Sequence, residues 1–338
     1  MIKPASAKCN ASCKYCFYRD EVAVRSVKDY GTCSISLAHS IIKKALEYVG
    51  SGHLSIVFQG GEPTLAGYDF FNEFFSFIQN ENVNQAKIFL SLQTNGLLID
   101  EKWAKLFKKH NVLVGISLDG TKADNSSRVA LGKEIYPDTL RAIAVLRDEG
   151  VPFNVLSVIH KGNVKSGKAI MQEFINRRFS FVQFIPYLGE QEEFMLTPEE
   201  YGAFLIDTFS IYGANFNTPN RISVREFDNY ILLLQTGKAE QCGMNGRCEP
   251  QLVLEGDGTA FPCDFYCTDD YVLGNVKDDS IEALLSSPVA TSFRNRTLPS
   301  DCTVCPYLRI CHGGCKRYSA TPFYCTSHKL FFQKHLGK

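Results

Sequence analysis

Short apolar segments alternate with amphipathic segments through the first 190 residues of the chain. The apolar segments are rich in Val, Ile and Phe, which is typical of buried strands, and they cover residues 54–59, 88–93, 113–118, 153–159 and 179–185. The amphipathic segments are typical of helices and cover residues 36–49, 68–79, 100–109, 136–148 and 164–177. A repeat of about thirty residues predicts βα units and a parallel sheet.

The number of units limits the architecture. If residues 1–5 form a first strand, the chain has six units, too few for a closed eight-stranded barrel. A partial barrel or an open doubly wound sheet remains. After residue 240 the periodicity weakens, and residues 253–255 and 259–262 flank a Gly-Asp-Gly turn as in a β-hairpin. We therefore expect an α/β domain over residues 1–220, a connecting segment with a helix at 231–234, and a cysteine-rich domain over 241–338.

Polar residues and glycine follow each predicted strand. In parallel α/β proteins the active site lies at the carboxyl ends of the strands. Glycine there lets the backbone approach a ligand closely. An ordinary βα turn also uses these residue types, and that alternative stays open for each exit alone. The five exits read Gln59-Gly-Gly-Glu-Pro63, Gln93-Thr-Asn-Gly96, Ser117-Leu-Asp-Gly120, His160-Lys-Gly162 and Pro186-Tyr-Leu188.

Charge and composition exclude some classes of protein. The 36 basic and 36 acidic residues balance, so no basic surplus favours nucleic acid or an anionic membrane as partner. The N-terminus lacks the apolar stretch of a signal peptide, and other apolar runs are too short to span a bilayer. We expect a soluble cytoplasmic protein. In that compartment thiols stay reduced, so the 13 cysteines predict metal binding rather than disulfides.

The first cysteine cluster reads Cys9-Asn-Ala-Ser-Cys13-Lys-Tyr-Cys16. Three thiolates leave one iron of a cubane cluster without a protein ligand, and that iron can bind a small molecule. A zinc site that lacks a nearby fourth ligand is the alternative interpretation.

The second cysteine cluster lies in the last hundred residues. Six of its thiols follow the spacings CX5C, CX2C, CX5C and CX3C, and single cysteines at 263 and 325 bring the number to eight. Eight thiolates suit two closed sites of four cysteines each. Two zinc ribbons are the alternative. Cys33 and Cys267 lie outside the pattern, and we expect each to be a core or surface thiol.

The CX3CX2C motif, followed by Gly60-Gly-Glu-Pro63, resembles the radical S-adenosylmethionine (SAM) superfamily. The resemblance implies a partial (β/α)6 barrel over residues 1–220. It also implies that the open iron chelates SAM and that one electron cleaves SAM to a 5′-deoxyadenosyl radical. The residues that match the superfamily's SAM contacts are Tyr15, Gly61, Ser117, Arg128 and Leu188.

The C-terminal cysteines resemble the SPASM domain, which carries auxiliary [4Fe–4S] clusters. Together with Cys9, Cys13 and Cys16, this resemblance implies three [4Fe–4S] clusters. One auxiliary cluster would be held by Cys242, Cys248, Cys263 and Cys315, and the other by Cys302, Cys305, Cys311 and Cys325.

Further segments resemble the anaerobic sulfatase-maturating enzymes, among them Ile2-Lys-Pro-Ala-Ser6, Phe58-Gln-Gly-Gly-Glu-Pro63 and Pro262-Cys-Asp-Phe-Tyr266. These enzymes oxidise one Cys or Ser of a sulfatase to Cα-formylglycine. The resemblance implies an unfolded sulfatase peptide as substrate and an electron donor such as flavodoxin or ferredoxin. It places Tyr18, Gln59 and Gln93 in the substrate pocket, with Asp264 as general base. For each of these side chains, satisfying nearby backbone groups is the plainer alternative.

Two other functions remain open at this point. A SPASM enzyme of a natural-product pathway would form a thioether or other crosslink in a peptide. Such enzymes often carry a leader-peptide-binding domain before the barrel, and the eight residues before Cys9 are too few for one. A zinc-binding interaction protein is the third hypothesis, and it would be colourless where an iron–sulfur protein is brown.

Overall fold

A computed structural model describes residues 1–295, 297–319 and 322–337 of the chain. The chain forms two compact units, and each is assembled from separate stretches. The first unit contains Met1–Ser117, Arg128–Phe153 and Pro250–Phe293, and the second contains Leu118–Ser127, Asn154–Glu249 and Arg294–Lys338. The expected division at residues 221–240 stays a prediction, although the helix expected at 231–234 is present within α8 (Arg225–Thr236).

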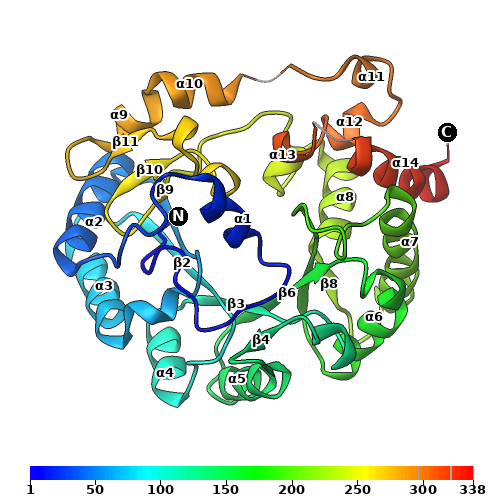
Figure 1. Cartoon of the computed structure of the whole chain (residues 1–338), viewed down its shortest axis with the longest axis horizontal. Helices are drawn as coiled ribbons and strands as arrows, with labels where there is room; N and C mark the ends of the chain where they lie inside the picture. Colours follow the sequence, from blue (N-terminus) through cyan, green and yellow to red (C-terminus); the bar gives the residue numbers. More distant parts are fainter. Residues whose placement is uncertain (296, 320–321, 338) are drawn as a thin grey trace. The chain divides into compact units, whose positions relative to one another are not determined.

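Three parallel strands form the centre of the first unit: β1 (His53–Phe58), β2 (Lys87–Thr94) and β3 (Leu113–Ser117). Four helices lie along the outside of these strands (Figure 1). They are α2 (Ile35–Val49), α3 (Tyr68–Glu81), α4 (Glu101–Lys109) and α5 (Tyr136–Asp148). Because parallel strands run in one direction, Gln59, Gln93 and Ser117 all lie at the same edge.

Aromatic packing holds α3 against the strands. The Phe58 side chain is fully buried, and its ring meets those of Phe71 and Phe74 edge-on with centroids 5.0 Å apart. Such contacts stabilise a core beyond the area they bury. At the start of α4, the Asp100 side chain accepts a hydrogen bond from the Trp103 amide at 3.0 Å, as an N-cap should.

The first unit also contains short elements from both ends of the chain. Strands β9 (Val253–Leu254) and β10 (Thr259–Phe261) pair antiparallel, which confirms the predicted hairpin, and β11 (Gly274–Asn275) pairs with β10. The remaining elements are α1 (Phe17–Val24), η1 (Pro63–Ala66), β4 (Val129–Ala130), β5 (Lys133–Glu134), η5 (Asp264–Tyr266), η6 (Asp269–Tyr271), α9 (Ile281–Ser286) and α10 (Pro288–Arg294).

The conditional first strand at residues 1–5 is absent. Ile2 makes only isolated bridges, to Phe58 and to Leu254. The chain then turns, because Pro4 has no amide to donate and the Ser6 amide donates back to the Lys3 carbonyl at 3.0 Å. Ser6 adopts the left-handed region with a φ of 52°. The sixth parallel strand is instead β8 (Ser223–Val224).

The second unit contains the parallel strands β6 (Phe153–Ile159), β7 (Phe181–Pro186) and β8, the first residue of β6 belonging to the first unit. All five strands predicted from the sequence are present, displaced by at most two residues at either end. The helical elements are η2 (Ala123–Asn125), η3 (Val164–Ser166), α6 (Gly167–Asn176), α7 (Pro198–Asn215), α8, η4 (Cys242–Met244), α11 (Ser300–Thr303), α12 (Leu308–Cys311), α13 (Lys316–Ser319) and α14 (Pro322–Leu336).

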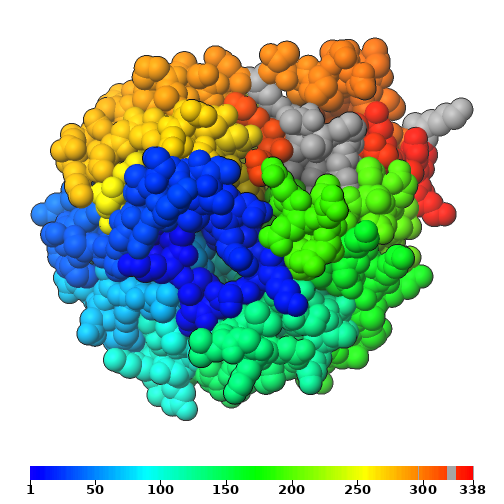
Figure 2. Space-filling model, in the orientation of Figure 1, coloured from blue at the N-terminus to red at the C-terminus, as the bar shows by residue number. Residues whose placement is uncertain are grey.

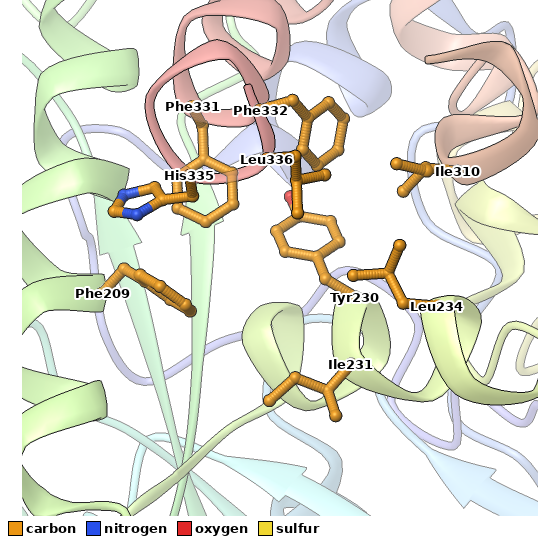
Figure 3. Close-up of a pocket in the computed structure, with 9 residues that line it drawn as sticks. All are labelled: Phe209, Tyr230, Ile231, Leu234, Ile310, Phe331, Phe332, His335 and Leu336. Atoms are coloured by element: carbon orange, nitrogen blue, oxygen red, sulfur yellow. The ribbon is translucent and has the colours of Figure 1, made fainter. Parts of the chain in front are cut away.

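Helix α14 packs on α7 and α8 through an aromatic cluster around a small apolar pocket (Figure 3). The pocket is lined by Phe209, Tyr230, Ile231, Leu234, Ile310, Phe331, Phe332, His335 and Leu336. Burial lowers the pKa of His335, so this ring stays neutral and packs as an aromatic group. We assign the pocket to packing. Within the described part of the chain, no helix has the length and apolar character needed to cross a bilayer.

Candidate active site

The first three cysteines lie in the loop that leads into α1, and Cys16 is the N-cap of this helix. Cys9, Cys13 and Cys16 are close enough for their charges to interact. Burial, together with the Cys13 thiol, raises the pKa of Cys16, so crowded thiols would stay protonated without a cation. Backbone amides already point at the sulfurs, and that of Ala11 lies 3.4 Å from Cys9 Sγ. This donor set fits an iron–sulfur cluster, which would take up the thiolates.

The glycines after β1 press against the cysteine loop. The Gly61 amide donates to the Ser6 carbonyl at 3.0 Å, and the Glu62 amide donates to the Lys8 carbonyl at 2.7 Å. A Cβ atom on residue 61 would lie 2.1 Å from the Lys8 carbonyl oxygen. Only glycine allows this approach without moving the backbone. The loop is therefore fixed by backbone contacts as well as by any cluster.

Glu62 joins two strand exits to the same loop. Its buried carboxylate accepts hydrogen bonds from Thr94 Oγ1 and from the Asn95 amide, both at 2.8 Å. Asn95 Nδ2 in turn donates to Asn10 Oδ1 at 2.8 Å and lies 3.7 Å from Cys9 Sγ. Burial raises the pKa of Glu62 above its usual value, and the hydrogen bonds it accepts offset only part of that rise. Neither Glu62 nor Asn95 was among the predicted site residues.

Four of the five predicted SAM contacts lie in the first unit. Arg128 donates to the Tyr15 hydroxyl at 3.2 Å, and both side chains are buried. Gln93 donates to Ser117 Oγ at 2.8 Å across the ends of β2 and β3. Leu188 follows β7 and belongs to the second unit. The structure thus joins Tyr15 to Arg128, and Ser117 to the predicted substrate contact Gln93. The contact of all five residues with SAM stays a prediction.

Asp264, Tyr18 and Gln59 form one hydrogen-bonded group. Tyr18 Oη donates to Asp264 Oδ2 at 2.6 Å, and Gln59 Nε2 lies 2.9 Å from both Asp264 Oδ2 and Tyr18 Oη. The three residues come from η5, α1 and the end of β1, and Asp264 directly follows Cys263. Figure 2 shows a hollow in the surface formed by the N-terminal segment, drawn in blue. The predicted base and two predicted substrate contacts are therefore one constellation.

Burial affects the Tyr18 phenol, and Lys3 contacts the other oxygen of Asp264. Burial, reinforced by Asp264, raises the pKa of Tyr18 well above its usual value, so the phenol stays neutral and remains a donor. Lys3 Nζ lies 3.0 Å from the other carboxylate oxygen, Asp264 Oδ1. The Asp264 carboxylate thus has hydrogen-bond donors at Oδ2 and a cation beside Oδ1.

In the second unit, three other C-terminal cysteines lie close to Cys311. Burial, then the thiols of Cys305, Cys302 and Cys325, raise the pKa of Cys311. The Gly313 amide donates to Cys311 Sγ at 3.4 Å. Neighbouring thiols of this kind fit a cubane held by four cysteines, as predicted for this set.

The other predicted auxiliary set divides between the units. Cys242, Cys248 and Cys315 belong to the second unit and Cys263 to the first. Cys242 and Cys248 lie close enough for their charges to interact, and a Cβ atom on Gly243 would lie 3.3 Å from that of Cys315. Across the described ranges, no three His, Cys, Asp or Glu side chains converge as tightly as a single metal ion requires. The joining of Cys263 to the other three stays a prediction.

Comparison with known proteins identifies the family. Residues 4–173 match the radical SAM superfamily, and residues 242–306 match the SPASM iron–sulfur cluster-binding domain. The cysteine-type anaerobic sulfatase-maturating enzyme of Clostridium novyi (strain NT) is 36% identical, over 100% of this chain and 95% of its own length. The chain belongs to the anaerobic sulfatase-maturating enzymes.

Two further members of the family show how similar the chain is to its relatives in structure and in sequence. The solved structure of native anSMEcpe with bound AdoMet and Cp18Cys peptide matches with a TM-score of 0.93 and 35% identity, over 99% of this chain and 95% of that one. The serine-type anaerobic sulfatase-maturating enzyme of Klebsiella aerogenes is 28% identical, over 93% of this chain and 78% of its own length. The predicted fold class, a radical SAM α/β domain with a SPASM domain, is confirmed.

For this sulfatase-maturating enzyme, sequence reasoning missed Lys3, which is buried among three carboxylates and a thiol. Lys3 was noticed only as part of the Ile2–Ser6 segment. Its contacts come from residues 21, 255, 264 and 267, too distant in the sequence to suggest a cluster. Cys267 is fully buried and Cys33 is 4% exposed, as core thiols should be.

Proposed function

We propose that this sulfatase-maturating enzyme oxidises one cysteine residue of an unfolded sulfatase polypeptide to Cα-formylglycine. The observation that carries the proposal is the contact of Asp264 with Tyr18 and Gln59, in the same unit as the CX3CX2C loop. Cysteine is favoured over serine as the target because the chain is 36% identical to a cysteine-type relative over its whole length and 28% identical to a serine-type one over 93% of it.

Three [4Fe–4S] clusters and SAM complete the proposed enzyme. Cys9, Cys13 and Cys16 would hold the SAM-binding cluster, and the two sets of four C-terminal cysteines would hold the auxiliary clusters. When bound, these groups supply a 5′-deoxyadenosyl radical that removes a hydrogen atom, and an acceptor for one electron. Tyr15, Gly61, Ser117, Arg128 and Leu188 would bind SAM, with the Arg128 guanidinium suited to a carboxylate.

Asp264 has the role of general base. After a hydrogen atom leaves the substrate Cβ, the carbon radical becomes a thioaldehyde only if the thiol also loses a proton and one electron departs. The Asp264 carboxylate accepts that proton, and hydrolysis of the thioaldehyde gives the aldehyde. Tyr18 and Gln59 orient the carboxylate through Oδ2, and the neutral Tyr18 phenol does not compete for the proton. General-base catalysis is typically worth about 10²–10⁴-fold.

The proposed surroundings of the reaction follow from its redox chemistry. SAM cleavage needs a low-potential electron, so a flavodoxin or ferredoxin is the proposed donor. We place the enzyme in the cytoplasm, where thiols stay reduced, with neither nucleic acid nor a membrane as partner. Gln93 would line the substrate pocket beside Ser117, to which it donates a hydrogen bond.

Mass spectrometry of peptide products tests the proposal. The reconstituted protein would be incubated anaerobically with SAM, reductant and peptides that contain Cys-X-Pro-X-Arg or Ser-X-Pro-X-Arg. We expect formylglycine from the cysteine peptide, at a higher rate than from the serine peptide. A thioether crosslink would favour the peptide-crosslinking alternative over this proposal. An unchanged peptide after SAM has been cleaved would show that the proposed substrate class is wrong.

A further inference from the structure

Lys3 is a lysine with almost no access to solvent, and it lies directly behind the proposed base. Its residue exposure is 1%, which is rare for a side chain that is almost never buried without partners. Its Nζ lies 3.0 Å from Asp264 Oδ1, 3.1 Å from Cys267 Sγ and 3.4 Å from Glu21 Oε2. The mechanism described above gives this ammonium no role.

Two hydrogen bonds join α1 to η5 and the residue that follows it. Tyr18 and Glu21 lie three residues apart on one face of α1. Tyr18 donates to Asp264, and Glu21 Oε1 accepts a hydrogen bond from the Cys267 amide at 3.0 Å. Lys3 Nζ contacts the carboxylates of both Asp264 and Glu21. One ammonium therefore links the N-terminal segment, the helix that carries Tyr18 and the turn that carries Asp264.

The charges explain why a lysine is tolerated here. Burial lowers the pKa of Lys3, but Asp264, Cys267, Glu21 and Glu255 together raise it well above its usual value. Arg25 pairs separately with Glu255 at 2.9 Å, so the carboxylate of Glu255 does not depend on Lys3 alone. In contrast, Asp264 Oδ1 accepts no hydrogen bond in the described part of the chain, and Lys3 is the cation at 3.0 Å from it.

The lysine stem is packed as closely as its head group. Gly60 has a φ of 117°, and a Cβ atom there would lie 3.2 Å from both Cβ and Cγ of Lys3. Gly60 follows Gln59 directly, so the strand exit that presents Gln59 rests on the lysine stem. Lys3 thus contacts the segments that carry all three members of the Asp264–Tyr18–Gln59 group.

We propose that Lys3 is a positioning residue for the oxidation step, holding the Asp264 carboxylate in the orientation in which Tyr18 and Gln59 present it to the substrate. The inference rests on the proposed function. Without the ammonium, the carboxylate loses its contact at Oδ1 and can turn away from the substrate thiol. A displacement of about 1 Å in a reacting group can reduce a rate about 10²-fold.

The test compares three substitutions with a matched lysine elsewhere. Lys3→Met removes the charge and keeps most of the stem, but it leaves several carboxylates with one fewer cation. Lys3→Met/Glu21→Gln also replaces the acid that Lys3 contacts at 3.4 Å, and Glu21→Gln alone is its background control. Lys44→Met is the matched control, because Lys44 Nζ makes three bonds of 2.7–3.1 Å to the carbonyls of residues 276, 277 and 279, away from the site.

The readout is the amount of formylglycine formed per 5′-deoxyadenosine released, together with iron content. We expect this ratio to fall about 10- to 100-fold in Lys3→Met/Glu21→Gln, with SAM cleavage within about 3-fold of the wild type and iron unchanged. Glu21→Gln and Lys44→Met should keep the wild-type ratio even if they lower the melting temperature. An unchanged ratio in the double variant, or parallel loss of SAM cleavage, iron and product, would overturn the positioning role.

A double-mutant cycle in thermal unfolding supplies a readout that does not need turnover. If Lys3 holds Asp264, the melting-temperature shifts of Lys3→Met and Asp264→Asn should be smaller together than their sum. Additive shifts would contradict the proposal. If the wild-type enzyme forms no formylglycine, the proposed function fails, while this cycle still decides whether Lys3 holds Asp264.

Discussion

Residues 53–117 of the first unit and residues 297–317 of the second hold their structure by different means. In the first region, alternate strand side chains enter an apolar core, and Phe58, Phe74, Phe75 and Phe107 are fully buried. The glycine turns that face the cysteine loop are fixed by backbone hydrogen bonds and by Glu62. We therefore expect this region to form its fold before any cluster binds.

Residues 297–317 have few such contacts. Only Tyr307 and Ile310 are buried there, and α11 and α12 are four residues long. Helices this short are unstable on their own. His312, Gly313 and Gly314 adopt positive φ, so the chain turns between Cys311 and Cys315. We infer from this difference that a cluster bound beside the first region would add chemistry to an existing fold, whereas metal binding in the second region would supply folding energy.

Replacing Cys9, Cys13 and Cys16 together by Ala should have the largest effect on activity and a small effect on the fold. SAM cleavage should be abolished, because no protein ligands remain for the open cluster. Iron after anaerobic reconstitution should fall from about twelve to about eight per chain, since three cubanes become two. Circular dichroism and the melting temperature should change little, because Gly61, Glu62 and Asn95 still hold the loop. Full iron content in this variant would contradict the assignment of the open cluster.

Replacing Cys302 and Cys305 by Ala should have a larger effect on the fold than the triple cysteine variant has. Two of four ligands are lost where few apolar contacts compensate, so solubility should fall and proteolysis should begin within residues 297–317. Formylglycine yield should also fall. Soluble yield, limited proteolysis and turnover measured side by side with the first variant give the contrast. A soluble, protease-resistant protein with normal turnover would show that the second region does not need its metal.

The smallest effect concerns a buried acid in the strand-and-helix part of the second unit. Glu226 accepts the Phe184 amide and Gln241 Nε2, both at 3.3 Å, and burial raises its pKa from 4.5 to about 7. The folded state therefore holds a proton that the unfolded state has lost between about pH 4.5 and 7. Stability from this group is present below about pH 4.5 and is lost as pH rises through about 7.

Thermal unfolding at pH 6 and pH 8 measures this loss. The wild type should lose about 1 kcal/mol more than Glu226→Gln between the two values, or a few degrees in melting temperature. Glu226→Gln keeps the shape and cannot ionise, so it serves as the control for all other titrating groups. Equal pH dependence in the two proteins would show that Glu226 is already ionised at pH 6.

The sequence predicted local features better than contacts between distant residues, for a physical reason. Strands such as β6 are predicted by local apolar runs, and the CX3CX2C motif is also a local pattern. The site around Asp264 depends on contacts between residues more than 200 positions apart, such as Tyr18 with Asp264 and Lys3 with Cys267. Family resemblance supplied Tyr18 and Asp264, but nothing in the local pattern showed that Lys3 would be buried. The strand expected at residues 1–5 was wrong because Pro4 and the turn after it end the pairing.

Asp264→Asn tests the central claim most directly. The substitution keeps the shape of the side chain and removes its basicity, while the three clusters and SAM binding should remain. With a cysteine peptide, we expect 5′-deoxyadenosine at close to the wild-type rate and formylglycine reduced about 10²–10⁴-fold. The matched measurement is the ratio of the two products by mass spectrometry, with iron content confirmed for each sample. Near-native formylglycine yield with three intact clusters would contradict the account and remove Asp264 from the mechanism.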